Sequence, residues 1–183
     1  YFSELNQGAF HNTVAMFDNT STLLKLKGKT FSDKWNEILS QRTAWGSTNF
    51  QSVIDLIVNT RKNHPEIALE DFPSTLVVVS DMQFNPSTSY YNRVSEQTNY
   101  ETAMTKLRSV FPSEFVDNFK IIWWHCSNRK TSDFPSTMEH GGTYMISGYD
   151  GSIVSFLLGG DMAVKTPDKK MPSMEDIVQA AFN

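Results

Sequence analysis

The stretch STLVVVSDMQF, residues 74–84, decides the fold class of this chain. From Leu76 to Val79 it is a continuous apolar run, mostly β-branched and without polar alternation. Such a run predicts a strand buried on both faces, in the middle of a parallel α/β sheet. The run ends in Ser80 and Asp81, at the strand end where open α/β sheets bind ligands. The same two residues also suit a plain turn or a helix cap, and both interpretations stay open.

Strands and helices alternate along the rest of the chain. We expect further strands at residues 10–19, 22–28, 118–126 and 141–149, the first two forming an antiparallel hairpin at a sheet edge. We expect helices at residues 32–41, 49–63, 151–160 and 173–182, and one from about Tyr100 to Val110 that Pro112 ends. This order predicts a Rossmann-like, doubly wound, mostly parallel α/β sheet.

Composition limits the class of protein. With 183 residues, 39% hydrophobic and 13% aromatic, the chain predicts a single domain spanning residues 1–183. A net charge of −4 without a basic block does not favour a general nucleic-acid binder. The apolar runs are too short to cross a bilayer, so we expect no membrane partner. The single cysteine, Cys126, cannot form an internal disulfide, which favours an intracellular, cytoplasmic protein.

The first residues have no initiator methionine. Tyr1, Phe2 and Leu5 fall on one side of what we interpret as the tail of an amphipathic helix, and Gly8 lies near its end. We therefore expect this domain to be the C-terminal part of a longer polypeptide, incomplete at its N-terminal side.

Four stretches together carry a family resemblance. They are WGSTNFQSVIDLIV (residues 45–58), TLVVVSDMQF (75–84), FKIIWWHC (119–126) and TYMISGYDGSIVSFLLGG (143–160). In this order they resemble the von Willebrand factor A-type fold. More narrowly, they are similar to its intracellular branch in the Ro-like, TROVE-related proteins and in a related family whose fourth strand also ends in Ser-Asp-Met-acidic/amide-Phe. The resemblance covers most of the chain.

The resemblance implies a metal-ion-dependent adhesion site. In that fold a divalent ion is held by an Asp-x-Ser-x-Ser loop, a threonine from a second loop and an aspartate after the fourth strand. Oxygen ligands of this kind suit Mg²⁺ or another hard divalent cation. The resemblance assigns the metal-ligand roles to Thr48 and Asp81, and Ser47, Asn49 and Ser80 become residues that orient the site.

One part of the family pattern is missing. No Asp-x-Ser-x-Ser precedes the strand TVAMF, because the first strand of the fold would lie before residue 1. A near match exists at Asp18–Thr22, but strand-like alternation follows it, so we interpret it as a hairpin turn; a metal loop is the alternative. In the family's order the absent strand lies between TVAMF and LVVVS. We therefore expect an upstream segment or another chain to complete the sheet, and direct pairing of those two strands would contradict this.

The polar stretch NPSTSYYNRVSEQTN, residues 85–99, follows the proposed site. It is long for a connection, so Tyr90, Tyr91 and Arg93 could shape a surface for a partner. A merely mobile loop is the alternative.

These features lead to three functional hypotheses. The first is a metal-dependent protein-interaction module, not an enzyme, that binds a protein partner through an ion-bridged acidic residue or through the loops around Asp81. The second, by analogy, is a component of a Ro-like RNA-binding protein whose RNA-binding region lies N-terminal to this sequence. The third is a Mg²⁺-dependent phosphohydrolase that uses Asp81.

Overall fold

The computed structural model describes residues 2–41, 48–84, 89–90, 93–94, 98–126, 141–148 and 153. The chain divides into two compact units, Tyr1–Met145 and Ile146–Asn183. The account below concerns the first unit, together with the described residues 146–148 at the boundary. Apart from the helical Ile153, the helices expected at 151–160 and 173–182 lie outside the described residues.

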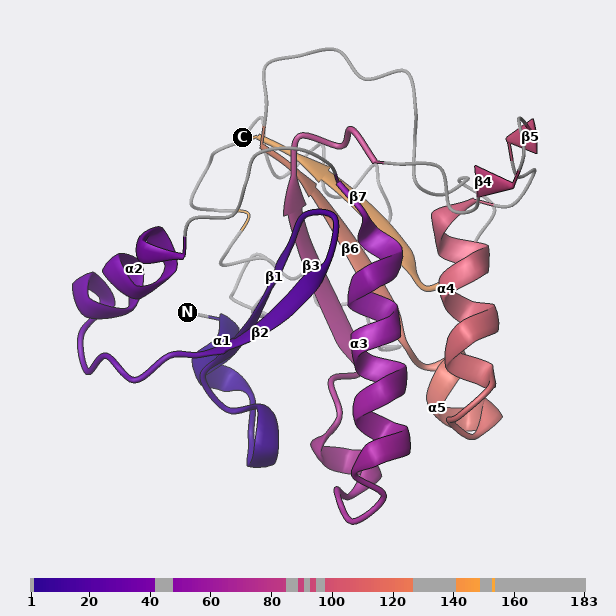
Figure 1. Cartoon of the computed structure of the whole chain (residues 1–183), viewed down its shortest axis with the longest axis horizontal. Coiled ribbons are helices and arrows are strands. Elements are labelled where there is room, and N and C mark those ends of the chain that lie inside the picture. Colours follow the sequence, from indigo (N-terminus) through magenta and orange to yellow (C-terminus); the bar gives the residue numbers. More distant parts are fainter. Residues whose placement is uncertain are drawn as a thin grey trace, which may run out of the picture. The chain divides into compact units, whose positions relative to one another are not determined.

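Short helices and strands alternate along the first unit (Figure 1). In its N-terminal half these are α1 (Phe2–Leu5), η1 (Gly8–Phe10), β1 (Thr13–Phe17), β2 (Ser21–Lys25), α2 (Phe31–Ser40) and α3 (Phe50–Asn63). They are followed by η2 (Leu69–Asp71), β3 (Thr75–Ser80), β4 (Ser89–Tyr90), β5 (Arg93–Val94), α4 (Asn99–Arg108), α5 (Ser113–Asp117), β6 (Lys120–His125) and β7 (Thr143–Ser147).

The main sheet contains three strands in the order β3-β6-β7. Strands β3 and β6 run parallel, in a register from Thr75 opposite Lys120 to Ser80 opposite His125. A parallel pair needs a crossover connection, and α4 and α5 lie in the chain between these two strands. The predicted α/β class with a parallel sheet is therefore confirmed.

Strands β1 and β2 form the predicted antiparallel hairpin, with Thr13 opposite Lys25 and Phe17 opposite Ser21. The Asp18 N–H donates to the Thr20 carbonyl across the turn (3.1 Å), and β2 follows at once. The hairpin-turn interpretation of this segment is thus confirmed. The hairpin is a sheet of its own, and no described residue of β1 pairs with β3. Completion of the sheet by another segment or chain stays a prediction.

One face of the main sheet packs against α3 and α4, which lie side by side in Figure 1. Helix α3 contributes the buried Phe50 and Ile54, α4 contributes Leu107, and β6 contributes Ile121 and Trp123. The apolar spacing of both helices places these side chains on one stripe facing the sheet. The helices at 49–63 and near 100–110 are confirmed.

The expectation that β3 is buried on both faces is wrong. Val78 is 4% exposed, whereas its neighbour Val79 is 56% exposed. Successive side chains of a strand point to opposite faces, so Val78 lies in the core beneath α3 and α4 and Val79 lies on the other face. A run of valines fits either environment, because sequence periodicity does not show what packs above each face.

Several small elements were not predicted. Helix α5 follows Pro112, and β4 and β5 form an antiparallel pair inside the segment expected to be a loop. Helix α2 begins earlier than expected, since Thr30 is its N-cap. No helix among the described residues is both long enough and apolar enough to cross a membrane.

Candidate functional site

Asp81 lies at the carboxyl end of β3, in a tight turn built by side chains. The Ser80 hydroxyl accepts the N–H of Met82 (3.1 Å), and Oδ1 of Asp81 accepts the N–H of Gln83 (3.2 Å). Met82 is buried and has a φ of 63°, a left-handed conformation that is costly for a non-glycine residue. Ser80 and Asp81 thus begin a turn, which is compatible with both interpretations of these residues, the plain turn and the ligand-binding strand end. The turn fixes a half-buried carboxylate at this edge of the sheet.

Thr48 and Asn49 lead directly into α3. Asn49 is the N-cap residue, but its side chain makes no capping hydrogen bond. Instead its Nδ2 donates to the carbonyl of Asn19 (3.0 Å), and its backbone N–H donates to the carbonyl of Asp18 (3.0 Å). The start of α3 is therefore attached to the β1–β2 turn, which brings a third segment to the site.

Three aromatic side chains join the start of α3 to the turn after β3. Phe50 lies edge-on to Trp123 with ring centroids 4.7 Å apart, and Phe84 lies 5.2 Å from Trp123 and 6.1 Å from Phe50. Phe50 follows Asn49 directly, and Phe84 belongs to the segment that Asp81 begins. This aromatic cluster is the contact that holds the two predicted ligand segments near each other. No hydrogen bond joins the side chains of Thr48 and Asp81 themselves.

A polar contact that sequence reasoning missed joins the first turns of α3 and α4. Nε2 of Gln51 donates to both the carbonyl (2.9 Å) and Oδ1 (3.0 Å) of Asn99, and both residues are buried. Gln51 could have been singled out, because it interrupts the start of an apolar helix face. Its Oε1 is buried and has no hydrogen-bond partner in the described part of the chain, and the same holds for Oγ1 of Thr102 and Nε2 of His125. His125 lies opposite Ser80 at the same strand ends.

The described residues do not complete a metal site. They contain no group of three or more histidine, cysteine, aspartate or glutamate side chains that could hold a metal ion. Thr48 and Asp81 are two of the ligands that the resemblance implies, and the Ser80 hydroxyl is already engaged by a backbone N–H. Mg²⁺ requires near-octahedral oxygen coordination. We therefore assign no step to a metal ion.

A family model with the description "Domain of unknown function (DUF7788)" matches residues 1–181. The chain belongs to the DUF7788 family. No curated protein and no solved structure matches it.

Part of the predicted partner loop is visible in this DUF7788 chain. Tyr90 and Arg93 lie opposite each other in the β4–β5 pair. Ser47 and Tyr91 lie outside the described residues. The segment after Asp81 therefore contains a backbone hairpin where a loop was expected, and its role in partner binding stays a prediction.

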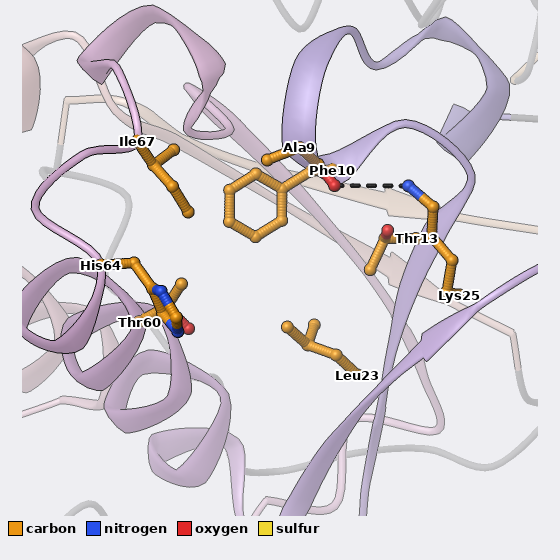
Figure 2. Close-up of a pocket in the computed structure, with 8 residues that line it drawn as sticks. All are labelled: Ala9, Phe10, Thr13, Leu23, Lys25, Thr60, His64 and Ile67. Atoms are coloured by element: carbon orange, nitrogen blue, oxygen red, sulfur yellow. Dashed lines mark hydrogen bonds between the residues drawn. The ribbon is translucent and has the colours of Figure 1, made fainter.

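A pocket of about 340 Å³ lies beside the C-terminal end of α3 (Figure 2). Phe10, Leu23 and Ile67 give it a mainly apolar wall, and His64 lies at the C-terminal end of α3. The lining residue Lys25 donates to the backbone carbonyls of Ala9 and His11. In this DUF7788 chain the pocket shares no lining residue with the predicted site.

Proposed function

We propose that this chain is a protein-interaction module that binds its partner at the carboxyl edge of the β3–β6 sheet, with Asp81 at the centre of the contact. The observation that carries the proposal is the fixed carboxylate. Asp81 is half-buried, its orientation is set by the turn to Gln83, and it makes no ion pair with any described residue.

A carboxylate held in this way is suited to recognition. Because the turn already fixes its orientation, binding costs less side-chain entropy than it would for a free aspartate. Charge-assisted hydrogen bonds are roughly twice as strong as neutral ones, so an arginine or lysine of a partner would gain most from this group. Phe84, three residues after Asp81, packs on Phe50 and Trp123, so the turn is anchored to α3 and β6.

The fold proposed for this module is the doubly wound, von Willebrand A-like one. The parallel β3–β6 pair, the two helices on one face and the Ser-Asp strand end support it. We also propose an intracellular location, on the basis of the single cysteine. The Ro-like RNA-binding component and the phosphohydrolase stay alternative hypotheses.

Affinity purification with two variants tests the proposal. Asp81→Asn removes the charge but keeps an oxygen that can accept the Gln83 N–H, whereas Asp81→Ala removes both. Wild type and variants are immobilised at equal density, and captured proteins are quantified by mass spectrometry. For a set of proteins captured by the wild type, we expect the captured amount to fall about tenfold with either variant.

The same experiment measures the role of a divalent ion. Capture is compared in Mg²⁺ and in chelator, which tests the prediction of metal dependence separately from the interaction itself. Circular dichroism must show that both variants are folded. If the folded Asp81→Asn protein captures the same proteins in the same amounts as wild type, the proposed contact surface is wrong.

A further inference from the structure

The pocket in Figure 2 lies between the β1–β2 hairpin, η1 and the C-terminal part of α3. The hairpin meets α3 at Ser21, whose hydroxyl is hydrogen-bonded to that of Ser52 (2.5 Å). Side chains alternate along a strand, so Leu23 and Lys25 lie on the same face of β2 as Ser21. Nearer the C-terminal end of α3, these two side chains line the pocket. The face of the hairpin that is directed at α3 is therefore not fully covered.

The walls of the pocket are mainly apolar. Phe10 lies against Phe72, with ring centroids 5.3 Å apart, and Ile67 packs on the main core. Leu23 is 44% exposed, although it belongs to the face of β2 that is directed at α3. The volume of about 340 Å³ lies at the lower end of the range for small-molecule sites. The pocket therefore suits an occupant with a small apolar body.

The formal charge inside the pocket is positive. Lys25 is the one lysine or arginine among the lining residues, and none of them is an aspartate or a glutamate. Its Nζ donates to the carbonyls of Ala9 (3.3 Å) and His11, which are neutral acceptors and do not cancel the charge. No carboxylate in the described ranges forms an ion pair with Lys25. An ammonium group has three N–H donors, so one is left for a ligand.

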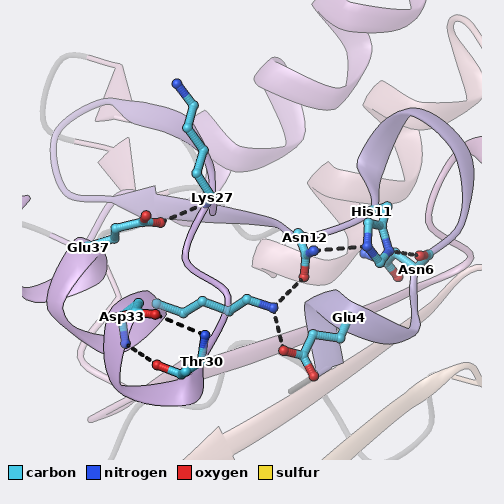
Figure 3. A network of polar contacts seen from close by, with 9 residues as sticks. Glu4, Asn6, His11, Asn12, Lys27, Thr30, Asp33 and Glu37 are labelled. Carbon is cyan, nitrogen blue, oxygen red and sulfur yellow. Dashed lines mark hydrogen bonds and ion pairs between the residues drawn. The ribbon is translucent and has the colours of Figure 1, made fainter.

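The segment that supplies these acceptors is itself held by a polar network (Figure 3). Nδ1 of His11 donates to the carbonyl of Asn6 (2.8 Å), and Nε2 of His11 accepts from Nδ2 of Asn12 (2.9 Å). Oδ1 of Asn12 in turn accepts from the ammonium group of Lys34 (3.0 Å). Because the backbone at His11 is fixed in this way, the Lys25 ammonium group is already in place and a ligand would not have to order it.

The opposite side of the pocket is polar but adds little charge. Figure 2 shows Thr60 and His64 there, across the pocket from Lys25. The Thr60 hydroxyl donates to a backbone carbonyl of its own helix (2.8 Å), and Nδ1 of His64 lies 2.9 Å from Oε1 of Glu66. Glu66 keeps its charge, but it does not line the pocket and its side chain is 69% exposed, so water and salt screen it. The charge that a ligand would meet inside the pocket is that of Lys25.

We propose that this pocket binds a small carboxylic acid, with its carboxylate on the ammonium group of Lys25 and its apolar body between Phe10, Leu23 and Ile67. A hydrogen bond between two charged groups is roughly twice as strong as a neutral one, which favours an acid over an uncharged compound of the same shape. A phosphate group fits less well, because it needs several donors and Lys25 has one N–H left. The site shares no residue with the Asp81 edge, so it does not depend on the function proposed above.

A titration followed by amide NMR spectra tests the proposal on the full 183-residue chain. The probes are phenylacetate and hexanoate. The matched compounds are phenylacetamide and hexanamide, which have the same bodies without the charge. We expect both acids to bind with a Kd of about 1 mM or tighter and to shift the signals of Phe10, Leu23 and Ile67 most. The uncharged amides should bind about five- to tenfold more weakly.

Two variants separate the charge from the cavity. Lys25→Met removes the ammonium group and keeps an unbranched side chain, so the acids should bind no more tightly than the amides. Leu23→Trp fills part of the pocket while Lys25 stays, and it should weaken binding of the acids at least about tenfold. Lys27→Met is the matched control, because Lys27 does not line the pocket, and it should leave all affinities unchanged.

Melting curves must accompany these titrations, because Lys25→Met also loses the hydrogen bonds to Ala9 and His11. If that variant is unfolded, the acid–amide comparison and Leu23→Trp decide the question. The proposal is overturned if neither acid binds, if acids and amides bind equally, or if the shifted signals lie around Asp81 instead. Acid binding that is unchanged in folded Lys25→Met or in Leu23→Trp overturns it as well.

Discussion

Replacing Phe50 by alanine tests the contact that holds the two site segments together. Phe50 is the first residue of α3, is 1% exposed, and lies 4.7 Å from Trp123 and 6.1 Å from Phe84 between ring centroids. Alanine would leave a cavity where three elements meet. The start of α3 and the turn that begins at Asp81 would then lose their common support.

The expected cost is large compared with the stability of a domain. Phenylalanine-to-alanine changes in cores cost about 3–5 kcal/mol, and two aromatic contacts place Phe50 in the upper half of that range. We therefore expect a loss of about 4 kcal/mol in the free energy of unfolding. For a chain of this length that lowers the melting temperature by roughly 8–16 °C. A typical domain has only about 5–15 kcal/mol in total, so the variant should be folded but fragile.

The assay is urea denaturation followed by tryptophan fluorescence, which Trp123 reports directly from the cluster. Phe31→Ala is the matched control, because it is the same chemical change at a side chain that is 74% exposed. We expect it to change stability by less than about 0.5 kcal/mol. A double-mutant cycle of Phe50→Leu with Phe84→Leu should give a coupling of about 0.5–1.5 kcal/mol.

Two results would refute the reasoning. If Phe50→Ala costs less than about 1.5 kcal/mol, the side chain is not in a close-packed core. If Phe31→Ala lowers the free energy of unfolding as much as Phe50→Ala, then the Phe31 side chain is packed on the domain and is not exposed as described.

Three further predictions concern local bonds. Thr30→Ala should remove about 1 kcal/mol of helix stability and speed hydrogen exchange in α2. The hydrogen bond and the charge of Lys34 lower the pKa of Glu4 from its ordinary value, and the hydrogen bonds with Thr30 lower the pKa of Asp33 in the same way. Groups with lowered carboxyl pKa values stabilise the fold only while they are ionised. Protection of the α2 amides against hydrogen exchange should therefore be full above about pH 5 and fall toward about pH 3. Equal protection factors at these two pH values would contradict this. Gln51→Leu should cost about 0.5–1.5 kcal/mol in urea melts, because the two hydrogen bonds from Gln51 to Asn99 are lost.

Much of the fold could be predicted because its elements have a clear period. The helical spacing of Phe50, Ile54 and Ile57 predicted α3, and that of Tyr100, Met104 and Leu107 predicted α4. The β-branched run predicted β3. Elements that depend on a few local bonds could not be found in this way. Helix α5 has five residues, and β4 and β5 have two each. All three are too short for apolar residues to recur with a helical or strand period.

The site was predictable in its parts but not in how they are joined. The strand end indicated Asp81, and the resemblance indicated Thr48 and Asn49. The sequence did not show that Asn49 would bind the β1–β2 turn instead of capping its helix, or that Gln51 would join α3 to α4. Both are hydrogen bonds between residues far apart in the sequence. The pattern of residues along one helix does not show which residue of another segment its side chains will bond.

The edge of β3 that faces away from β6 bears on the prediction that another strand completes the sheet. The N–H groups of Lys120 and Cys126 donate to the carbonyls of Ser74 and Ser80, so alternate residues beginning at Ser74 direct their backbone toward β6. In a parallel ladder the residues between them, such as Val77 and Val79, direct N–H and C=O the other way. No described strand pairs with those groups. An apolar strand with an unpaired edge and a valine face that is partly exposed is a template for strand addition, which gives that prediction a physical reason.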